Sequence, residues 1–149
     1  MTHEVDLQGW AEGERRNAVE FADALGVPPE LYTSDPMVLI PALQDYVSRA
    51  PFSEFEQSDW VTLHADLMSY VADYLINKHG ARWSVENDPA SPRGYRYVIA
   101  ATGRDGRSHV LDPLQLVGQE FTSLPIDITR MLAGAELALG LASPTSSDR

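Results

Sequence analysis

The sequence predicts an α+β fold, in which N-terminal helices lead to a three-stranded antiparallel meander and then to a C-terminal helix. Three observations support this prediction. Apolar residues recur at helical spacing up to about residue 79, alternate over about 82–111, and return to helical spacing near residue 126. No repeat or linker divides the sequence, so we expect residues 1–142 to form a single domain and the small polar residues 143–149 to be a disordered tail.

Two helices are expected before residue 50. The first covers Leu7–Leu25, and the sequence GVPP directly after it is a stop signal. After a connector over 30–34, the Asp-Pro pair at 35–36 provides an N-cap and a first-turn proline for the second helix. Because a proline inside a helix costs about 3 kcal/mol, we expect the regular part to begin near Pro41 and to reach Arg49.

The longest element is a helix expected over about 58–79, with two different faces. One face is apolar and includes Trp60 and Leu67, but His64 interrupts it. The Ser-Asp pair at 58–59 is placed to cap the start of the helix, and the glycine that follows residue 79 is placed to end it. The opposite face is polar, and its members are Thr62, Asp66, Ser69, Asp73 and Asn77.

The periodicity changes to that of strands after this helix. Residues 82–86 alternate, with Trp83 on the apolar side, and the turn-rich sequence NDPASPRG follows. Tyr95–Thr102 is rich in aromatic and β-branched residues, as a central strand should be. The Asp-Gly pair at 105–106 then marks a hairpin, and a third strand returns to Leu111.

Two more helices are expected, a short one over about 113–117 and a last one from about 126 to 141. We expect the sheet to cover the apolar face of the long helix while the other helices close the remaining side. Trp60 and Trp83 would then both belong to the core.

The composition limits the classes of function. The chain carries 22 acidic and 11 basic residues, for a formal net charge of -11, which argues against a nucleic-acid-binding surface. It has no cysteine, which excludes disulfides, thiolate nucleophiles and Cys-ligated zinc. The first ten residues do not resemble a signal peptide, and no apolar run approaches the roughly 20 residues that span a bilayer. We therefore expect a soluble, cytoplasmic protein that binds neither membranes nor nucleic acid.

Known catalytic motifs are missing from the sequence. It contains no nucleophile elbow, phosphate loop, dinucleotide fingerprint or zinc-protease motif, so we expect no metal and no cofactor. His64 has no ligand-type neighbour at helical spacing, and the simpler interpretation is a structural histidine that bonds a backbone carbonyl or a tyrosine. Asp66 and Asp73 lie two turns apart, some 10 Å, which matches a pair of carboxylates in an inverting reaction but also a solvated acidic face.

The segment over about 59–120 is similar to small bacterial α+β domains of unknown function. The features that carry this resemblance are the long helix, the sequence HGARW, the strand YRYVI, the DG hairpin and the LDP that ends the meander. The resemblance implies an α+β fold. It transfers no catalytic residue, and it does not decide between an enzyme and a binding module.

Two functional hypotheses remain. The first is a non-enzymatic, acidic protein-binding module of the immunity-protein, secretion-chaperone or adaptor type, which docks a basic partner. Its partner-binding residues would be Glu54, Glu56, Asp59, Asp66 and Asp73.

The alternative is a small hydrolase or ligand-binding domain with a pocket between the long helix and the sheet. His64 would be its base and Arg96 its anion anchor, with Tyr97 beside them. Four arginines around the hairpin are the only local reversal of the acidic field, and they either bind an anion or protect the sheet edge: Arg93, Arg96, Arg104 and Arg107.

Overall fold

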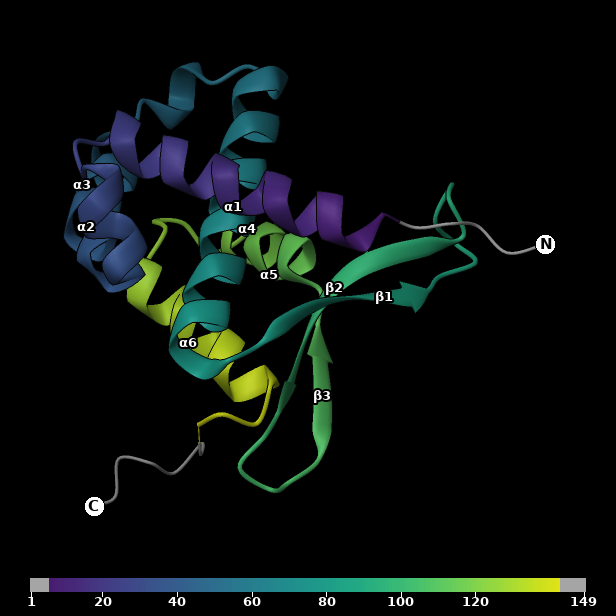
Figure 1. Ribbon diagram of the computed structural model, residues 1–149. Coiled ribbons are helices and arrows are strands. Elements are labelled where there is room, and N and C mark those ends of the chain that lie inside the picture. Colours follow the sequence, from purple (N-terminus) through teal and green to yellow (C-terminus); the bar gives the residue numbers. More distant parts are fainter. Residues whose placement is uncertain (1–5, 143–149) are drawn as a thin grey trace.

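The computed structural model describes residues 6–142 and confirms the α+β class (Figure 1). The expected disordered tail, 143–149, lies outside the described residues. The order of elements is helices, then a three-stranded sheet, then helices. The bounds are α1 Leu7–Ala24, α2 Pro29–Ser34, the 3₁₀ helix η1 Pro36–Leu39, α3 Ile40–Arg49, the 3₁₀ helix η2 Phe52–Glu54, α4 Gln57–His79, β1 Arg82–Asn87, β2 Tyr95–Thr102, β3 Ser108–Leu111, α5 Pro113–Glu120 and α6 Ile128–Ala138.

Between α1 and α4, a proline lies at the start of each helix. The expected connector over 30–34 is in fact a short helix, α2, which begins at Pro29 and is supported by a hydrogen bond from the Thr33 hydroxyl to the Pro29 carbonyl (2.9 Å). The Asp35 side chain accepts from the backbone N–H of Met37 (3.1 Å), as an N-cap should. Pro41 lies in the first turn of α3, where no intrahelical N–H bond is needed, so the later start of this helix is confirmed.

Helix α4 begins one residue earlier than expected, at Gln57. Its N-cap is Glu56 rather than Ser58, and the Asp59 carboxylate reaches back to accept from the Glu56 N–H (2.9 Å). At the other end Gly80 has φ of 70°, the left-handed conformation that glycine adopts at low cost. The capping chemistry therefore sets both ends of the helix.

The meander is confirmed, with strand order β1-β2-β3 and antiparallel pairing throughout. Trp83 pairs with Ile99, and Ile99 pairs with Leu111, so these three side chains form a row across the sheet. Trp83 and Ile99 in this row are buried. Gly106 at the β2–β3 turn has φ of 80°, as a tight hairpin requires.

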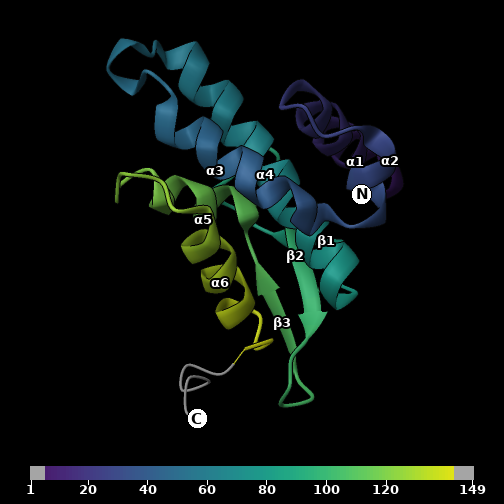
Figure 2. The ribbon, with the colours of Figure 1, turned by 90° about the vertical axis from the view of Figure 1, so that its left-hand side faces the viewer.

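Helix α4 lies at the centre of the molecule. Helix α1 crosses it in Figure 1, and the view in Figure 2 shows α1 and α2 on one side of α4 and α5 and α6 on the other. The closest neighbours of α4 are α1 and α5, whereas the sheet makes its closest contacts with helices through β1 to α1 and β3 to α6. This arrangement differs from the expected one, in which the sheet covers the apolar face of α4.

The buried side chains form one continuous core. Leu67, Val71 and Leu75 of α4 are fully buried within it, and Tyr70 donates a buried hydrogen bond from its hydroxyl to the Pro36 carbonyl (2.9 Å). Trp83 belongs to this core, but Trp60 is only half-buried. The two tryptophans therefore have different roles, contrary to the expectation from the sequence.

Replacement of Trp83 by Ala is expected to lower the free energy of unfolding by about 3–5 kcal/mol, because the indole is 7% exposed and packs edge-on against Trp10. Denaturant unfolding measures this change. The control is Val61→Ala, which should change stability by less than about 0.5 kcal/mol because Val61 is 60% exposed. Equal stability of the W83A variant and the wild type would contradict the assigned core.

Candidate functional site

The middle of the polar face of α4 is covered by α1, so the prediction that Asp73 is part of an exposed acidic face is wrong. Asp73 is 3% exposed, and its Oδ1 is 3.1 Å from Nη1 of Arg15, which comes from α1. Tyr32 of α2 is also buried beside this carboxylate. The helical wheel of α4 correctly places Asp73 opposite the apolar face, but it contains no information about a second helix that packs there.

The neighbouring polar groups bond to α1 as well. The Asn17 side-chain amide donates to Oδ1 of Asp66 (3.1 Å) and to Oγ of Ser69 (2.9 Å). The Ser69 hydroxyl in turn donates to the Glu14 carboxylate (2.6 Å). Asp66 is half-buried in this network, and its Oδ1 is already engaged by Asn17. We call these side chains, together with Arg15 and Asp73, the α1–α4 network.

Burial raises the pKa of all three carboxylates in the α1–α4 network, which are those of Glu14, Asp66 and Asp73. It is the largest cause that raises the pKa of Asp73, against the opposing influence of Tyr32 and Arg15. It also raises the pKa of Asp66 and of Glu14, and the charge of Asp66 adds to the shift at Glu14. These carboxylates are therefore less stable as anions in the folded protein than in water.

The other three predicted acidic residues are exposed. Glu54 ends η2, Glu56 is the N-cap of α4, and Asp59 lies in the first turn of α4. Among the described residues, no Lys, Arg or His forms an ion pair with these carboxylates. The acidic surface predicted from the sequence is thus reduced to one end of α4.

An aromatic cluster lies directly beside these carboxylates. The ring of Trp60 lies 5.0 Å from that of Phe52, 5.0 Å from that of Phe55 and 5.1 Å from that of Phe121. The cluster joins η2 and the end of α5 to the start of α4. The spacing of Phe52, Phe55 and Trp60 in the sequence is a signal that could have identified it, but the position of Phe121 could not be predicted without the fold.

Trp60 and Phe121 of this cluster form one wall of an open groove of about 280 Å³, which we call the Trp60 groove. Val61 is 60% exposed at its edge and Leu124 is 49% exposed. Apolar side chains concentrated in this way on a surface mark interaction sites more often than isolated exposed ones do. The groove is lined by Gln57, Trp60, Val61, His64, Phe121 and Leu124.

His64 lies in this groove and not in the core, and it bonds a backbone carbonyl, one of the partners expected for a structural histidine. Its Nε2 is 2.6 Å from the Leu114 carbonyl oxygen, and because a carbonyl only accepts, Nε2 is the donor. The ring also packs edge-on against Phe121, with 5.2 Å between ring centroids. His64 therefore fixes α5 against α4.

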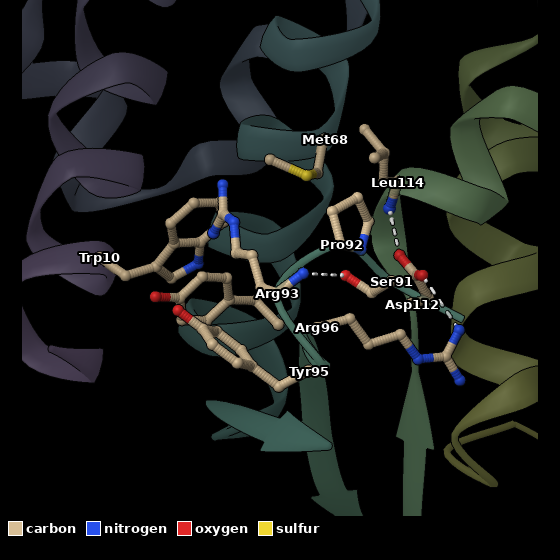
Figure 3. A pocket seen from close by; sticks show the side chains of 10 residues that line it. Trp10, Met68, Ser91, Pro92, Arg93, Tyr95, Arg96, Asp112 and Leu114 are labelled. Carbon is tan, nitrogen blue, oxygen red and sulfur yellow. Dashed lines mark hydrogen bonds and ion pairs between the residues drawn. The ribbon is translucent and has the colours of Figure 1, made fainter. Parts of the chain in front are cut away.

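Arg96 and Tyr97 lie on β2 and line a different hollow, a cavity of about 350 Å³ that we call the Trp10 cavity (Figure 3). The Arg96 guanidinium is held by Glu86 (2.6 Å) and by Asp112 (3.2 Å), so its charge is already compensated. Hydrogen bonding to Glu86 raises the pKa of Arg96. Tyr97 stacks on Trp10 with 3.9 Å between ring centroids.

The predicted trio of His64, Arg96 and Tyr97 is therefore only partly brought together. His64 and Arg96 line a shared shallow hollow, but Tyr97 lines only the Trp10 cavity with Arg96. Sequence reasoning missed Trp10 as a lining residue, because the sequence does not show that the start of the first helix packs on the sheet.

Comparisons of the chain with protein-family models, with curated proteins and with solved structures find no match. In the part of the chain that the structure describes, no helix combines the length and apolar character needed to cross a membrane. Within residues 6–142, no three side chains of the His, Asp or Glu type converge as a metal site would require.

The raised pKa values in the α1–α4 network predict that its carboxylates oppose folding less as the pH falls. A carboxyl group with a raised pKa in the folded state opposes folding when ionised, and this penalty disappears as the pH drops through the raised pKa towards the ordinary values of 4.5 for Glu14 and 3.8 for Asp66. The double variant E14Q/D66N is therefore expected to unfold at higher denaturant concentration than the wild type at pH 7, with little difference near pH 4.

The matched control is Glu20→Gln, which removes a carboxylate from the exposed side of α1. Denaturant unfolding of the three proteins across this pH range measures the effect. A stabilisation by E14Q/D66N that is no larger than that by E20Q at pH 7 would show that the burial of these carboxylates does not oppose folding.

Proposed function

We propose that the protein is a non-enzymatic binding module of the cytoplasm, of the immunity-protein, secretion-chaperone or adaptor type, and that it docks a basic protein through the Trp60 groove. The observation that carries this proposal is the position of three exposed carboxylates, which form no ion pair with any described residue, beside an exposed apolar groove. They are Glu54, Glu56 and Asp59. The acidic site inferred from the sequence is thereby moved from the polar face of α4 to its first turn.

The groove has the physical properties of a recognition site. Its aromatic wall is packed on two sides by η2 and α5, so little side-chain freedom is lost when a partner binds. Aromatic residues at the centre of an apolar patch supply much of the free energy of protein association. Val61 and Leu124 are exposed, and a partner's apolar side chain would cover them.

The charge around the groove defines the chemistry of the partner. With a net charge of -11 the whole chain attracts cations, and the carboxylates of Glu54, Glu56 and Asp59 concentrate this attraction at the groove. A partner that fits presents a large apolar side chain flanked by lysines or arginines. The apolar contact supplies affinity, and the charges speed up association and make it salt-sensitive.

The alternative of a small hydrolase receives no support from the contacts of its proposed residues. The Nε2 atom of His64 is occupied by a carbonyl, and the charge of Arg96 is compensated by two carboxylates. We therefore propose no catalytic residue.

Site-specific photocrosslinking in the cells that produce the protein tests the proposed function directly. A photoreactive amino acid at Val61 is expected to capture a basic protein, whereas the same group at Leu137 on α6, which is 48% exposed, is not. Identical crosslinking patterns at the two positions would contradict the proposal.

Substitutions separate the apolar and the charged contributions. The double variant V61S/L124S is expected to weaken binding of the captured partner about tenfold or more through loss of apolar contact. Its control is Leu137→Ser, which removes an equally exposed apolar side chain from α6.

The variant E54Q/E56Q is expected to slow association of the captured partner at low salt and to have little effect at high salt. Glu56 and Asp59 both belong to the cap of α4; glutamine at position 56 keeps a side-chain oxygen for the cap, and Asp59 is left unchanged so that its hydrogen bond from the Glu56 N–H is retained. The control E20Q/E30Q removes the same charge from α1 and α2, at exposed positions. Kinetic binding measurements in which the two charge variants behave alike would mean that the carboxylates at the groove have no special role.

A further inference from the structure

We propose that the Trp10 cavity binds a small planar aromatic anion, with Arg93 as the charge that pairs with its carboxylate or phosphate group. This site is separate from the Trp60 groove and does not depend on the proposed function. The lining combines three aromatic rings, one methionine and the guanidinium of Arg93, which forms no ion pair within residues 6–142 (Figure 3). A volume of about 350 Å³ is at the lower end of the range for small-ligand pockets, roughly 300–1,000 Å³.

The aromatic walls are held in place by the fold. Trp10 from α1 and Tyr97 from β2 stack with an interplanar angle of 6°, and Tyr95 stands perpendicular to Tyr97 with 5.7 Å between ring centroids. Trp10 in turn lies edge-on against the buried Trp83, 5.5 Å between centroids. The stacked faces of Trp10 and Tyr97 cover each other, and this packing gives the cavity a rigid aromatic lining that suits contact with a planar ring.

The two arginines that line the cavity differ in whether a carboxylate of the protein already pairs with them. Arg96 is engaged by Glu86 and Asp112, and Asp112 also accepts from the backbone N–H groups of Leu114 and Gln115. Arg93, in contrast, forms no ion pair with any described residue. Its backbone N–H donates to Oγ of Ser91 (3.3 Å). The remaining charge of the lining is thus the guanidinium of Arg93.

The position of Arg93 points this charge at the aromatic walls. In Figure 3 its side chain extends along the same side of the cavity as Trp10, and its charge acts on Tyr97 by lowering the pKa of that hydroxyl against the larger, opposite influence of burial. Asp6 and Asp88 act on Tyr97 and Arg96 from outside the lining, so they weaken the attraction for an anion without occupying the cavity. We therefore expect weak binding of a simple anion and tighter binding when a ring adds its contact with the aromatic lining.

These properties define the ligand by chemistry. A guanidinium presents paired N–H donors that match a carboxylate or a phosphate group. The ring contacts the aromatic lining of the cavity while the acidic group reaches Arg93. Of the four arginines that the sequence places around the hairpin, Arg93 and Arg96 line this cavity, and Arg104 and Arg107 are exposed on the β2–β3 turn.

Binding of indole-3-acetate, followed by ¹H–¹⁵N NMR, tests the proposal. The indole N–H of Trp10 is buried and has no hydrogen-bond partner among the described residues, so its resonance is a local reporter that W10F assigns. Indole-3-acetamide has the same ring without the charge, and acetate has the charge without the ring. We expect indole-3-acetate to bind about tenfold more tightly than either, with shifts at Trp10 and in β2.

The variant R93Q is expected to weaken indole-3-acetate binding about tenfold and to leave indole-3-acetamide binding unchanged, whereas R104Q affects neither. Phenyl phosphate in the same titration shows whether the site prefers a phosphate or a carboxylate, and binding of either supports the proposal. Equal binding of the acid and the amide, equal binding by R93Q and wild type, or the absence of shifts at Trp10 up to ~10 mM ligand would overturn it.

Discussion

The rest of the structure depends on the contact between Arg15 and the buried carboxylate of Asp73. A carboxylate removed from water costs free energy unless a partner compensates it. Here the partner comes from α1, so this helix has to lie across the polar face of α4. On either side of this contact α1 packs through aromatic rings, with Trp10 on Tyr97 of the sheet and Phe21 against Tyr46 of α3, 6.3 Å between the latter ring centroids.

The two candidate sites are consequences of where α1 covers α4 and where it does not. The segment of α4 from Leu67 to Leu75 is buried on all sides, and α1 supplies the polar partners of Ser69 and Asp73 there. The first turn of α4 extends beyond this cover, and its exposed surface carries the Trp60 groove with its carboxylates. The Trp10 cavity forms where the start of α1 meets β2. The position of α1 on α4 thus leaves the protein with one acidic and one aromatic surface.

Local signals in the sequence were sufficient for most of the fold. The glycine after α4, the Asp-Pro cap before η1 and the Asp-Gly hairpin each act within a few residues, and each was predicted correctly. Helix α2 was missed because six residues that begin with a proline carry little periodicity. The candidate functional sites were harder to predict from the sequence. The exposure of Asp73 depends on Arg15, 58 residues away, and no local pattern contains that pairing.

The account is tested most directly by a double-mutant cycle between these two residues. In the R15M variant the Asp73 carboxylate keeps its burial but loses its counter-charge, so the variant should be less stable by about 1–3 kcal/mol, a cost limited by the 40% exposure of the Arg15 side chain. The substitution D73N should then raise the free energy of unfolding in the R15M background by about 1 kcal/mol or more beyond its effect in the wild type. Equal effects of D73N in the two backgrounds, measured by denaturant unfolding at pH 7, would contradict the claim that this ion pair holds α1 on α4.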